Sequence, residues 1–234
     1  VMLVALDRVH QKIKLISLAR DSYVFIPEFA SFSKLAYSYT WGGAAMAVKN
    51  LNYNYYLNVS DYIAVDFDQL AEIIDRIGGV TVNIDEDEAR YLSNYPNVHV
   101  GDCLLDGETA VSYARIRKSS ATDSDRKRTG RQREVILSIL NTLQTMPLSQ
   151  YPRFVRDCLG MCATSFEAET LLTMAAETLG QNYTVEQYFF PEGQVDWWAG
   201  LIKEYFYYVY DLRRASDRIY RIIYEELYIS GYDD

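Results

Sequence analysis

The chain has 234 residues, which suits one large domain or two small ones, and 49% of them are hydrophobic. Charged residues make up 24%, a composition that argues against disorder and predicts a sizeable core. The net charge of −9 excludes the broad basic surface that general nucleic-acid binding requires. No apolar run is long enough to cross a bilayer, and no signal peptide opens the sequence.

Strands and helices alternate along the first half of the sequence. Its apolar spacing predicts strands at 1–6, 12–19, 61–67 and 80–84, and helices at 42–59 and 67–77. The first helix is expected to begin at its Gly-Gly pair, and Gly78-Gly79 is expected to end the second. Because Val1 lies inside a β-type run, we expect the natural chain to begin further upstream, where any membrane anchor would lie.

The second half is predicted to be mainly helical. Its patterns predict helices at 131–143 and 167–180, a strand at 184–190 that ends at Pro191, and a C-terminal helix at 205–228. Strands that alternate with helices indicate an α/β fold, in which helices cover a sheet and loops at the strand ends carry function. Because we find no internal repeat and no linker, we predict a single domain over residues 1–234.

The three cysteines, Cys103, Cys158 and Cys162, make neither an even disulfide framework nor a zinc site. Cys158 and Cys162 lie four residues apart and would share one face of a helix. We interpret them as two small buried hydrophobic residues, with a disulfide to Cys103 as the alternative. The redox compartment stays open on this evidence.

The segment from Arg115 to Arg133 concentrates positive charge in an acidic chain. It holds eight Lys and Arg and two Asp, a net charge of +6, so the remainder of the chain carries −15. Such a patch attracts a negatively charged ligand, although a solvated helix face would explain the same run of charge. A second charged pair, Arg20-Asp21, ends another predicted strand and favours binding, because the two sites could converge.

Two arginines open this positive segment. Residues 113–117 alternate, and a short strand there would place Arg115 and Arg117 on one side, about 7 Å apart. Arginine suits neighbouring phosphates because its planar fork donates two parallel hydrogen bonds and stays charged at any physiological pH.

A helix that starts near Asp125 would add three more polar side chains to the same region. Asp125, Arg128 and Gln132 follow one another at helical spacing, so they would share one face. A diphosphate could lie along this row. Asp125 would then either hold an arginine in position or accept a proton from an attacking hydroxyl.

Five segments, in order, carry a family resemblance: SLARDSYVFIP, KLAYSYTWGG, VDFDQLAEIIDRIGGVTVNI, LLDGETAVSYARIR and DRKRTGRQREV. They resemble the LytR-CpsA-Psr family of cell-wall glycopolymer transferases, most strongly from Val1 to about Leu140. The resemblance implies a three-layer α/β/α sandwich with a central mixed sheet and a hydrophobic lipid-binding cavity. Aromatic and aliphatic residues between 37 and 80 and in the C-terminal helices would line that cavity, although the same residues suit an ordinary core.

The resemblance also implies an activity and a place. Members of the family transfer glycopolymers, such as teichoic acid or capsule, from undecaprenyl pyrophosphate to peptidoglycan, and they form a phosphodiester. They act on the extracellular face of the plasma membrane of Gram-positive bacteria, held by an N-terminal transmembrane helix that would lie upstream of this chain. The implied partners are the lipid-linked glycopolymer, the peptidoglycan acceptor and the membrane, with no nucleic acid.

The family motifs assign roles to particular residues of this sequence. The positions that match the family's pyrophosphate-binding residues are Arg20, Lys34 (its loop lysine), Arg115, Arg117, Arg128 and Gln132. Asp21 and Asp125 match its acidic positions, and with Arg20, Arg115 and Arg117 they are the expected catalytic residues.

Mg²⁺ is the cofactor that the resemblance implies. The family holds it with two aspartates just before the strand with which this chain begins, so we assign no metal ligand here. Two other functions fit the same residues: a polyprenyl-pyrophosphate phosphohydrolase, in which water attacks, and a non-catalytic polyprenyl-phosphate binding module. Product analysis would separate the hydrolase from the transferase, and binding without magnesium-dependent chemistry would favour the module.

Overall fold

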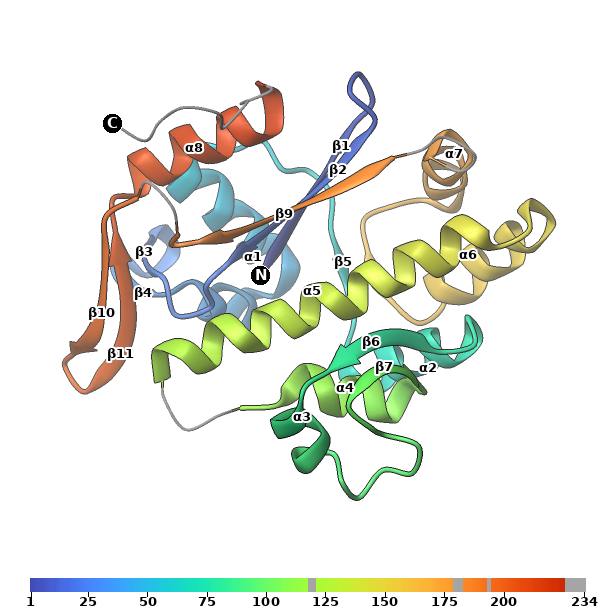
Figure 1. Ribbon diagram of the computed structural model, residues 1–234. Helices are drawn as coiled ribbons and strands as arrows, with labels where there is room; N and C mark the ends of the chain where they lie inside the picture. The colour runs from blue at the N-terminus through green and yellow to red at the C-terminus, as the bar shows by residue number, and fades with distance from the viewer. Residues whose placement is uncertain (118–120, 179–182, 193–194, 226–234) are drawn as a thin grey trace. The chain divides into compact units, whose positions relative to one another are not determined.

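The computed structural model describes residues 1–117, 121–178, 183–192 and 195–225, with the side chains of 121–125 and 148 left out (Figure 1). The chain forms two compact units, which we describe separately. Unit 1 comprises Val1–Ser60 and Tyr183–Asp234, and unit 2 comprises Asp61–Asn182. A single domain over the whole chain stays a prediction.

Unit 1 is built on a mixed three-stranded sheet of β1 (Met2–Asp7), β2 (Lys12–Leu18) and β9 (Thr184–Phe190). β2 pairs antiparallel with β1 and parallel with β9, so the predicted central mixed sheet is confirmed. Six of the seven residues of β2 are buried, as expected for a central strand with two covered faces. In β1, however, Val4 is 63% exposed, because this strand forms an edge of the sheet and not its buried middle.

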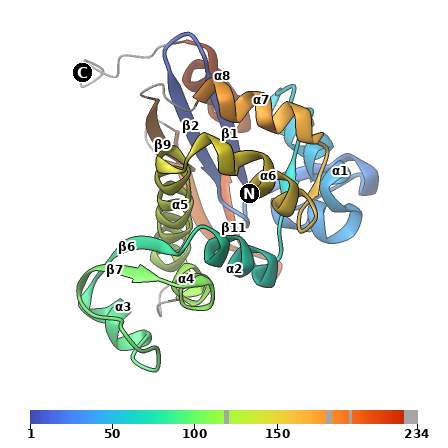
Figure 2. The same cartoon turned by 90° about the vertical axis from the view of Figure 1, so that its right-hand side faces the viewer.

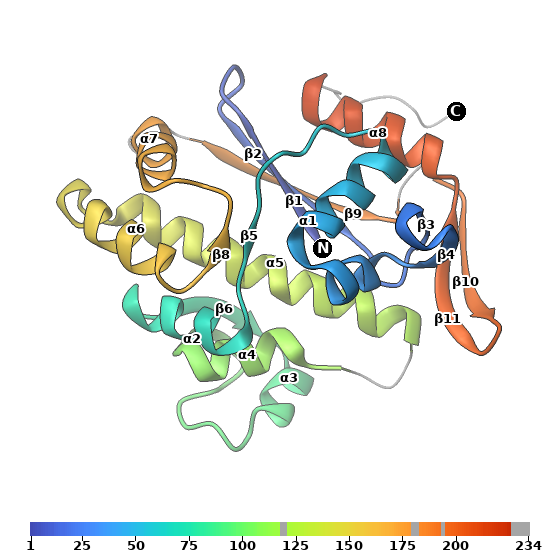
Figure 3. The ribbon, with the colours of Figure 1, turned by 180° about the vertical axis from the view of Figure 1, so that it is seen from behind.

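Two helices of unit 1, α1 (Leu35–Tyr55) and α8 (Leu212–Tyr224), pack against each other, and α8 also contacts β1 and β2 (Figure 3). The side chain of Asp211 begins α8 by accepting bonds from two backbone N–H groups. The prediction that the first helix begins at Gly42-Gly43 is wrong. That pair kinks α1 in its middle, since Gly43 has φ +64° and ψ −158°, values that glycine adopts without strain.

Two hairpins complete unit 1: β3 (Tyr23–Ile26) with β4 (Ser31–Lys34) across the 3₁₀ turn η1 (Pro27–Phe29), and β10 (Trp197–Ile202) with β11 (Tyr205–Tyr210). The first hairpin is not among the predicted strands, and residues 205–210 of the second were predicted to belong to the C-terminal helix. That assignment is wrong for residues 205–210. Lys203 and Glu204 both have positive φ, the geometry of a two-residue hairpin turn, and they reverse the chain without the usual Asn-Gly signal.

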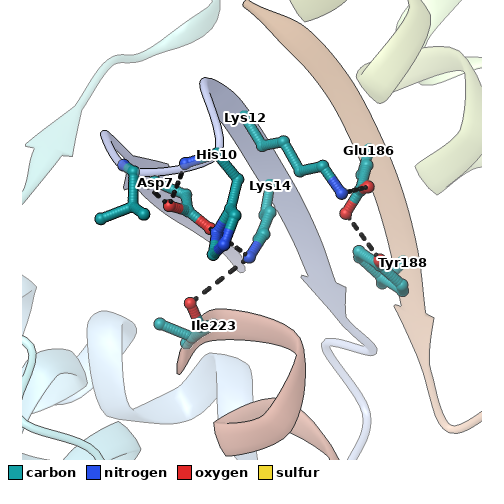
Figure 4. A network of polar contacts seen from close by, with 8 residues as sticks. Asp7, His10, Lys12, Lys14, Glu186, Tyr188 and Ile223 are labelled. Carbon is teal, nitrogen blue, oxygen red and sulfur yellow. Dashed lines mark hydrogen bonds and ion pairs between the residues drawn. The ribbon is translucent and has the colours of Figure 1, made fainter. Parts of the chain in front are cut away.

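A buried lysine ties α8 to the end of the β1–β2 hairpin (Figure 4). Lys14 Nζ is 2.8 Å from Asp7 Oδ2 and donates to the carbonyl of Ile223 in the last turn of α8. Asp7 also accepts bonds from His10 through its ring and its backbone N–H. Burial acts to raise the pKa of Asp7, but the bonds from Lys14 and His10 outweigh it and hold that pKa well below its usual range.

Unit 2 is built around a second apolar core (Figure 2). This core lies between the antiparallel strands β6 (Val80–Ile84) and β7 (Gly101–Leu105) on one side and three helices on the other. Those helices are α2 (Phe67–Arg76), α4 (Gly107–Arg115) and α5 (Ala121–Thr145). The remaining elements of unit 2 are α3 (Glu86–Tyr91), η2 (Leu148–Gln150), α6 (Tyr151–Leu159), α7 (Ala168–Thr178), β5 (Ile63–Ala64) and β8 (Ala163–Thr164). The helices predicted at 67–77 and 131–143 and the strand at 80–84 are confirmed, whereas the strand predicted at 61–67 shrinks to the two residues of β5.

Three further sequence-based expectations can be compared with these units. Cys103, Cys158 and Cys162 are all free thiols, so the disulfide alternative is wrong; burial raises the pKa of Cys158 to about 11. Within the described ranges, no helix has the length and apolarity that a bilayer crossing demands. A hydrophobic cavity for a lipid stays a prediction, because the pocket of about 380 Å³ in unit 2 has polar residues such as Asp75 and Asp106 in its lining.

Candidate functional site

The turn after β2 brings three predicted residues of unit 1 together. Asp21 Oδ1 lies 2.8 Å from Lys34 Nζ and 3.6 Å from Arg20 Nε. The side chains of Asp21 and Lys34 are only 15% and 13% exposed, whereas that of Arg20 is 46% exposed. A carboxylate between two cations lowers their combined charge to +1 and holds them at one point of the surface.

The backbone fixes this turn from both sides. The carbonyl of Arg20 accepts a bond from the N–H of Ala36 in the first turn of α1, and the carbonyl of Asp21 accepts one from Tyr208 on β11. Since the first N–H groups of a helix have no partner within the helix, the turn also satisfies a donor at the start of α1. The positions of Arg20 and Asp21 therefore depend on two neighbouring elements and not on the turn alone.

Uncharged hydroxyls lie beneath the turn. Ser22 Oγ donates to the carbonyl of Ala19 and is 2.9 Å from the hydroxyl of Tyr210, which is 2.6 Å from that of Tyr55. Burial raises the pKa of Tyr210 to about 12, and burial together with Tyr210 raises the pKa of Tyr55 further above its usual range. This chain stays neutral at physiological pH and adds no charge beneath the cluster of Arg20, Asp21 and Lys34.

In unit 2, Arg115 and Arg117 lie at the end of α4, and the prediction of a strand at 113–117 is wrong. Asp106 caps α4 by accepting a bond from the backbone of Thr109. The buried residues Ala110, Tyr113 and Ala114 then recur at helical spacing and face the core. The five-residue alternation was too short to outweigh this longer helical pattern, so the expected spacing of two strand arginines does not apply.

The two arginines meet different surroundings. Arg115 is the last residue of α4, and its guanidinium carbon lies 4.5 Å from the centre of the Phe67 ring. Arg117 follows Ile116 and is exposed. Among the described residues, neither arginine forms an ion pair with a carboxylate.

A residue without an assigned role, Arg131 on α5, holds the segment that carries these two arginines. Its Nε is 2.7 Å from Oε1 of Glu88, and its Nη1 donates to the carbonyl of Ile116 at 3.0 Å. The side chains of Arg131 and Glu88 are only 4% and 9% exposed. Because Ile116 separates Arg115 from Arg117, the buried pair fixes the backbone between the two arginines.

A sequence signal for this role exists. Arg131, Val135 and Ser138 are buried and recur at i, i+4 and i+7, so they share the face of α5 that is turned toward the unit 2 core. Within a run of positive charge, a cation in register with that apolar face is the one to expect inside the fold.

The row predicted on α5 is confirmed along the backbone. α5 begins at Ala121, so Asp125, Arg128 and Gln132 lie on one face of one helix. Arg128 and Gln132 are half-buried. The side chain of Asp125 lies outside the described residues, and its role stays a prediction.

The predicted site residues thus fall into two groups, one in each unit. Arg20, Asp21 and Lys34 lie together in unit 1, and the remaining five lie on α4, on α5 and between them in unit 2. Each group offers charge and hydrogen-bond donors to an anion. That one diphosphate contacts both groups stays a prediction.

A magnesium site does not follow from the described residues. They contain no group of three or more His, Cys, Asp and Glu side chains that could hold a metal ion. Asp21, the carboxylate of the unit 1 group, already contacts Lys34 at 2.8 Å and has Arg20 beside it. Hard cations prefer several oxygen ligands, so Asp21 alone does not make such a site.

Comparison with known proteins gives consistent matches. A family model, described as the LytR_cpsA_psr family, matches residues 1–220. The polyisoprenyl-teichoic acid–peptidoglycan teichoic acid transferase TagU of Enterococcus faecalis is 32% identical over 132 residues, which are 56% of this chain and 42% of that protein. The chain therefore matches less than half the length of this curated relative.

Solved structures extend the likeness to nearly the whole chain. The crystal structure of TagT from B. subtilis gives a TM-score of 0.77 at 20% identity and covers 95% of this chain and 84% of that one. A structure of TagT with bound octaprenyl pyrophosphate lipid gives 0.74 at 17% identity, with coverages of 95% and 83%. At these identities the likeness shows a shared fold.

Proposed function

Because the chain belongs to the LytR-CpsA-Psr family, we propose that it is a phosphotransferase that moves a glycopolymer from undecaprenyl pyrophosphate to peptidoglycan. The observation that carries this proposal is the family match over residues 1–220, within which two groups of cations lie at strand and helix ends. The transferase name of the matched relative supports the reaction, and the lipid held by a protein of the same fold supports the donor. Teichoic acid and capsule are the polymers proposed for transfer.

The cations would bind the diphosphate of the donor. Arg115 and Arg117 have their charge available, since no carboxylate among the described residues pairs with them. Arg20 and Lys34 in unit 1, and Arg128 and Gln132 on α5, are further candidate donors to phosphate oxygens. Charge-assisted bonds to phosphate oxygens strengthen as negative charge develops during phosphoryl transfer, so these groups would lower the barrier as well as bind.

The proposed reaction forms one bond to phosphorus and breaks another. A hydroxyl of the acceptor sugar attacks the phosphorus next to the glycopolymer, the bridging P–O bond breaks, and polyprenyl phosphate leaves. The proton of the hydroxyl passes to a carboxylate, for which Asp125 and Asp21 are the candidates. Asp21 lies 2.8 Å from Lys34 Nζ and 3.6 Å from Arg20 Nε, beside the cations that would bind the diphosphate.

The setting is part of the proposal. We propose that the chain works on the extracellular face of the plasma membrane in Gram-positive bacteria, with an N-terminal membrane anchor in the full-length protein. Magnesium dependence is a separate proposal, because the described residues do not make a magnesium site by themselves. Titration with a chelator during the transfer assay would measure it.

The test is the Arg117→Ala variant of the full-length protein in a transfer assay with a lipid-linked oligosaccharide donor. Removing a charge-assisted contact made in the transition state should reduce transfer at least about 100-fold. Arg90→Ala is the matched control, because Arg90 is an exposed arginine of unit 2 whose side chain is 76% exposed. Near-wild-type transfer by the Arg117→Ala variant would overturn the proposal.

Product analysis separates the two other functions. Release of free glycopolymer phosphate without attachment to the acceptor would identify a phosphohydrolase. Binding of polyprenyl phosphate with no turnover of the lipid-linked donor would identify a binding module. Analysis of one reaction mixture for attached polymer, free polymer phosphate and unreacted donor therefore distinguishes the transferase, the phosphohydrolase and the binding module.

A further inference from the structure

The solvent-facing side of the β3–β4 hairpin is aromatic, where a two-stranded hairpin ordinarily carries polar residues. Side chains alternate along a strand, and on β3 Val24 and Ile26 are fully buried in the unit 1 core. Tyr23 and Phe25 therefore point to the opposite face, where Phe32 of β4 is 53% exposed. Aromatic residues in such positions cost solubility and add nothing to the core, which indicates a binding surface.

These rings belong to a continuous row that we call the aromatic ledge, made of Tyr207, Tyr23, Phe32, Phe25 and Tyr53. Successive ring centres along it are 4.9, 5.0, 5.3 and 5.8 Å apart. β11 contributes the first ring and α1 the last, and both elements contact β3 (Figure 3). Contacts among rings from four elements hold the ledge in one shape before any ligand binds.

The ledge begins at the unit 1 cation cluster. Lys34 is the cross-strand partner of Tyr23, and its Nζ lies 5.7 Å from the centre of the Tyr207 ring. The same Nζ contacts Asp21. Tyr207 is only 7% exposed, so a ligand would lie on the rings from Tyr23 to Tyr53, and Lys34, the cross-strand partner of Tyr23, connects that surface to the place where we propose that phosphate chemistry takes place.

The charges around the ledge indicate an uncharged ligand. Between residues 20 and 55 every Lys and Arg is paired with a carboxylate: Arg20 and Lys34 with Asp21, and Lys49 with Glu28 at 2.8 Å. A surface that docks on anionic lipid uses clusters of unpaired Lys and Arg, which this stretch lacks. Sugar rings suit the ledge, because their C–H faces stack on aromatic faces and their hydroxyls stay in water.

One edge of the hairpin is closed to a peptide strand. The side chain of Asn54 accepts a bond from the backbone N–H of Phe25 at 3.0 Å and donates one to its carbonyl at 2.8 Å. An added strand would need those two backbone groups for its own ladder. This argues against a peptide that extends the sheet at β3 and leaves the ring faces as the binding surface.

We propose that the aromatic ledge binds the sugar backbone of the acceptor, an uncharged polysaccharide strand, and leads it to the cation cluster of unit 1. This inference rests on the proposed transferase function, since it names where that enzyme would hold its acceptor. The outer rings, Phe32 and Tyr53, do most of the binding, because they are 53% and 55% exposed. The inner rings support them.

The test measures binding of a soluble hexamer of β-1,4-linked N-acetylglucosamine to the 234-residue chain by calorimetry. We expect Phe32→Ala and Tyr53→Ala each to weaken binding about three- to tenfold, the loss expected for one stacking contact. Tyr220→Ala is the matched control. Tyr220 is 51% exposed on α8 and packs against another tyrosine ring at 4.8 Å, but it lies outside the ledge. Its removal should leave binding unchanged.

Other outcomes overturn the inference. The ledge is not a sugar site if the wild-type chain does not bind the hexamer, or if Tyr220→Ala weakens binding as much as Phe32→Ala. A second titration with polyprenyl phosphate in detergent micelles would assign the ledge to the lipid if Phe32→Ala weakened only that binding. Failure here with loss of transfer in Arg117→Ala would leave the proposed function standing, and the reverse result would leave the ledge as a sugar site without the transferase.

Discussion

Among the described residues, each unit contains an ion pair between nearly buried side chains, and these two pairs are closely matched. In unit 1, Lys14 and Asp7 are 2.8 Å apart with side chains 2% and 11% exposed; in unit 2, Arg131 and Glu88 are 2.7 Å apart with side chains 4% and 9% exposed. Each cation also donates to a backbone carbonyl of another segment. Burial and distance alone would therefore assign the two pairs the same role.

The carbonyls distinguish them. Lys14 reaches Ile223 in the last turn of α8, so its pair fastens a helix to a hairpin (Figure 4). Arg131 reaches Ile116, the residue between the two arginines proposed to bind diphosphate. Both cations thus hold a carboxylate and a carbonyl at once, and the difference lies in which segment the carbonyl belongs to. We infer that the first pair stabilises the fold and that the second also positions the residues of the proposed site.

The Arg131→Met variant should have the largest effect on stability. It leaves the carboxylate of Glu88 buried without its partner, and breaking such a pair costs about 3–5 kcal/mol of the free energy of unfolding. Urea unfolding followed by circular dichroism would measure this loss. The double variant Arg131→Met/Glu88→Leu removes both charges and should recover most of the stability.

The double variant also tests whether the proposed site depends on the pair of Arg131 and Glu88. We expect it to fold and still to bind polyprenyl pyrophosphate at least about tenfold more weakly, because the carbonyl of Ile116 has lost its donor. Wild-type affinity in a stably folded double variant would show that the pair in unit 2 serves the fold alone.

The Asp7→Asn variant should lose about 2–3 kcal/mol, less than Arg131→Met because the asparagine side chain fills the same space and its oxygen can still accept a bond from Lys14. Binding of polyprenyl pyrophosphate by the folded variant should stay at the wild-type level. Asp87→Asn is the control, since it removes an exposed pair with Arg90 whose side chains are 76% and 56% exposed and should cost under about 0.5 kcal/mol. An equal loss in both variants would contradict the role of Lys14.

Acid should reduce the difference in the free energy of unfolding between wild type and the Asp7→Asn variant. Burial raises the pKa of Asp7, but the bonds from Lys14 and His10 more than offset it, so the folded pKa lies below the unfolded one. The carboxylate therefore adds stability above its unfolded pKa of about 4, and that contribution is lost as the pH falls toward the folded pKa. Urea unfolding at pH 7, 5 and 3 would give the free energy of unfolding of both proteins. The difference between wild type and Asp7→Asn should be about 1 kcal/mol smaller at pH 3 than at pH 7. A constant difference would show that Asp7 acts through packing.

Elements with several agreeing local signals could be predicted to within a residue or two. α2 has apolar residues at helical spacing, a reciprocal cap between Asp66 and Gln69, and Gly78-Gly79 after its end. β11 could not be predicted, because its tyrosines suit either a helix face or a strand and its turn residues carry no Gly, Asn or Pro. Where two periods fit the same short run, the tertiary partners decide.

The same limit applies to the candidate site. Residue type and spacing were enough to select Arg20 and the row on α5, because cations at element ends are visible in a sequence, whereas Lys34 was assigned by the family resemblance alone. The ion pair between Lys34 and Asp21 could not be predicted, since it depends on the β3–β4 hairpin, which the sequence pattern does not indicate. Arg131 was harder to select because its own neighbours in the sequence are charged; its register with Val135 and Ser138 indicates burial, and its contact with Glu88, 43 positions away, shows what it holds.

The ion pair between Asp21 and Lys34 differs from the two buried pairs, because it is partly exposed and lies in the proposed site itself. Asp21→Asn removes a negative charge beside Arg20 and Lys34 and should cost little stability, since the backbone of the turn keeps its bonds to Ala36 and Tyr208. The two cations would then attract diphosphate more strongly, and we expect affinity for polyprenyl pyrophosphate to rise about three- to tenfold while transfer falls. Calorimetry and the transfer assay measure the two effects. Weaker binding would instead mean that Asp21 holds the cations in position, as Glu88 holds Arg131, and the contrast between fold-maintaining and site-maintaining pairs would then extend to the surface.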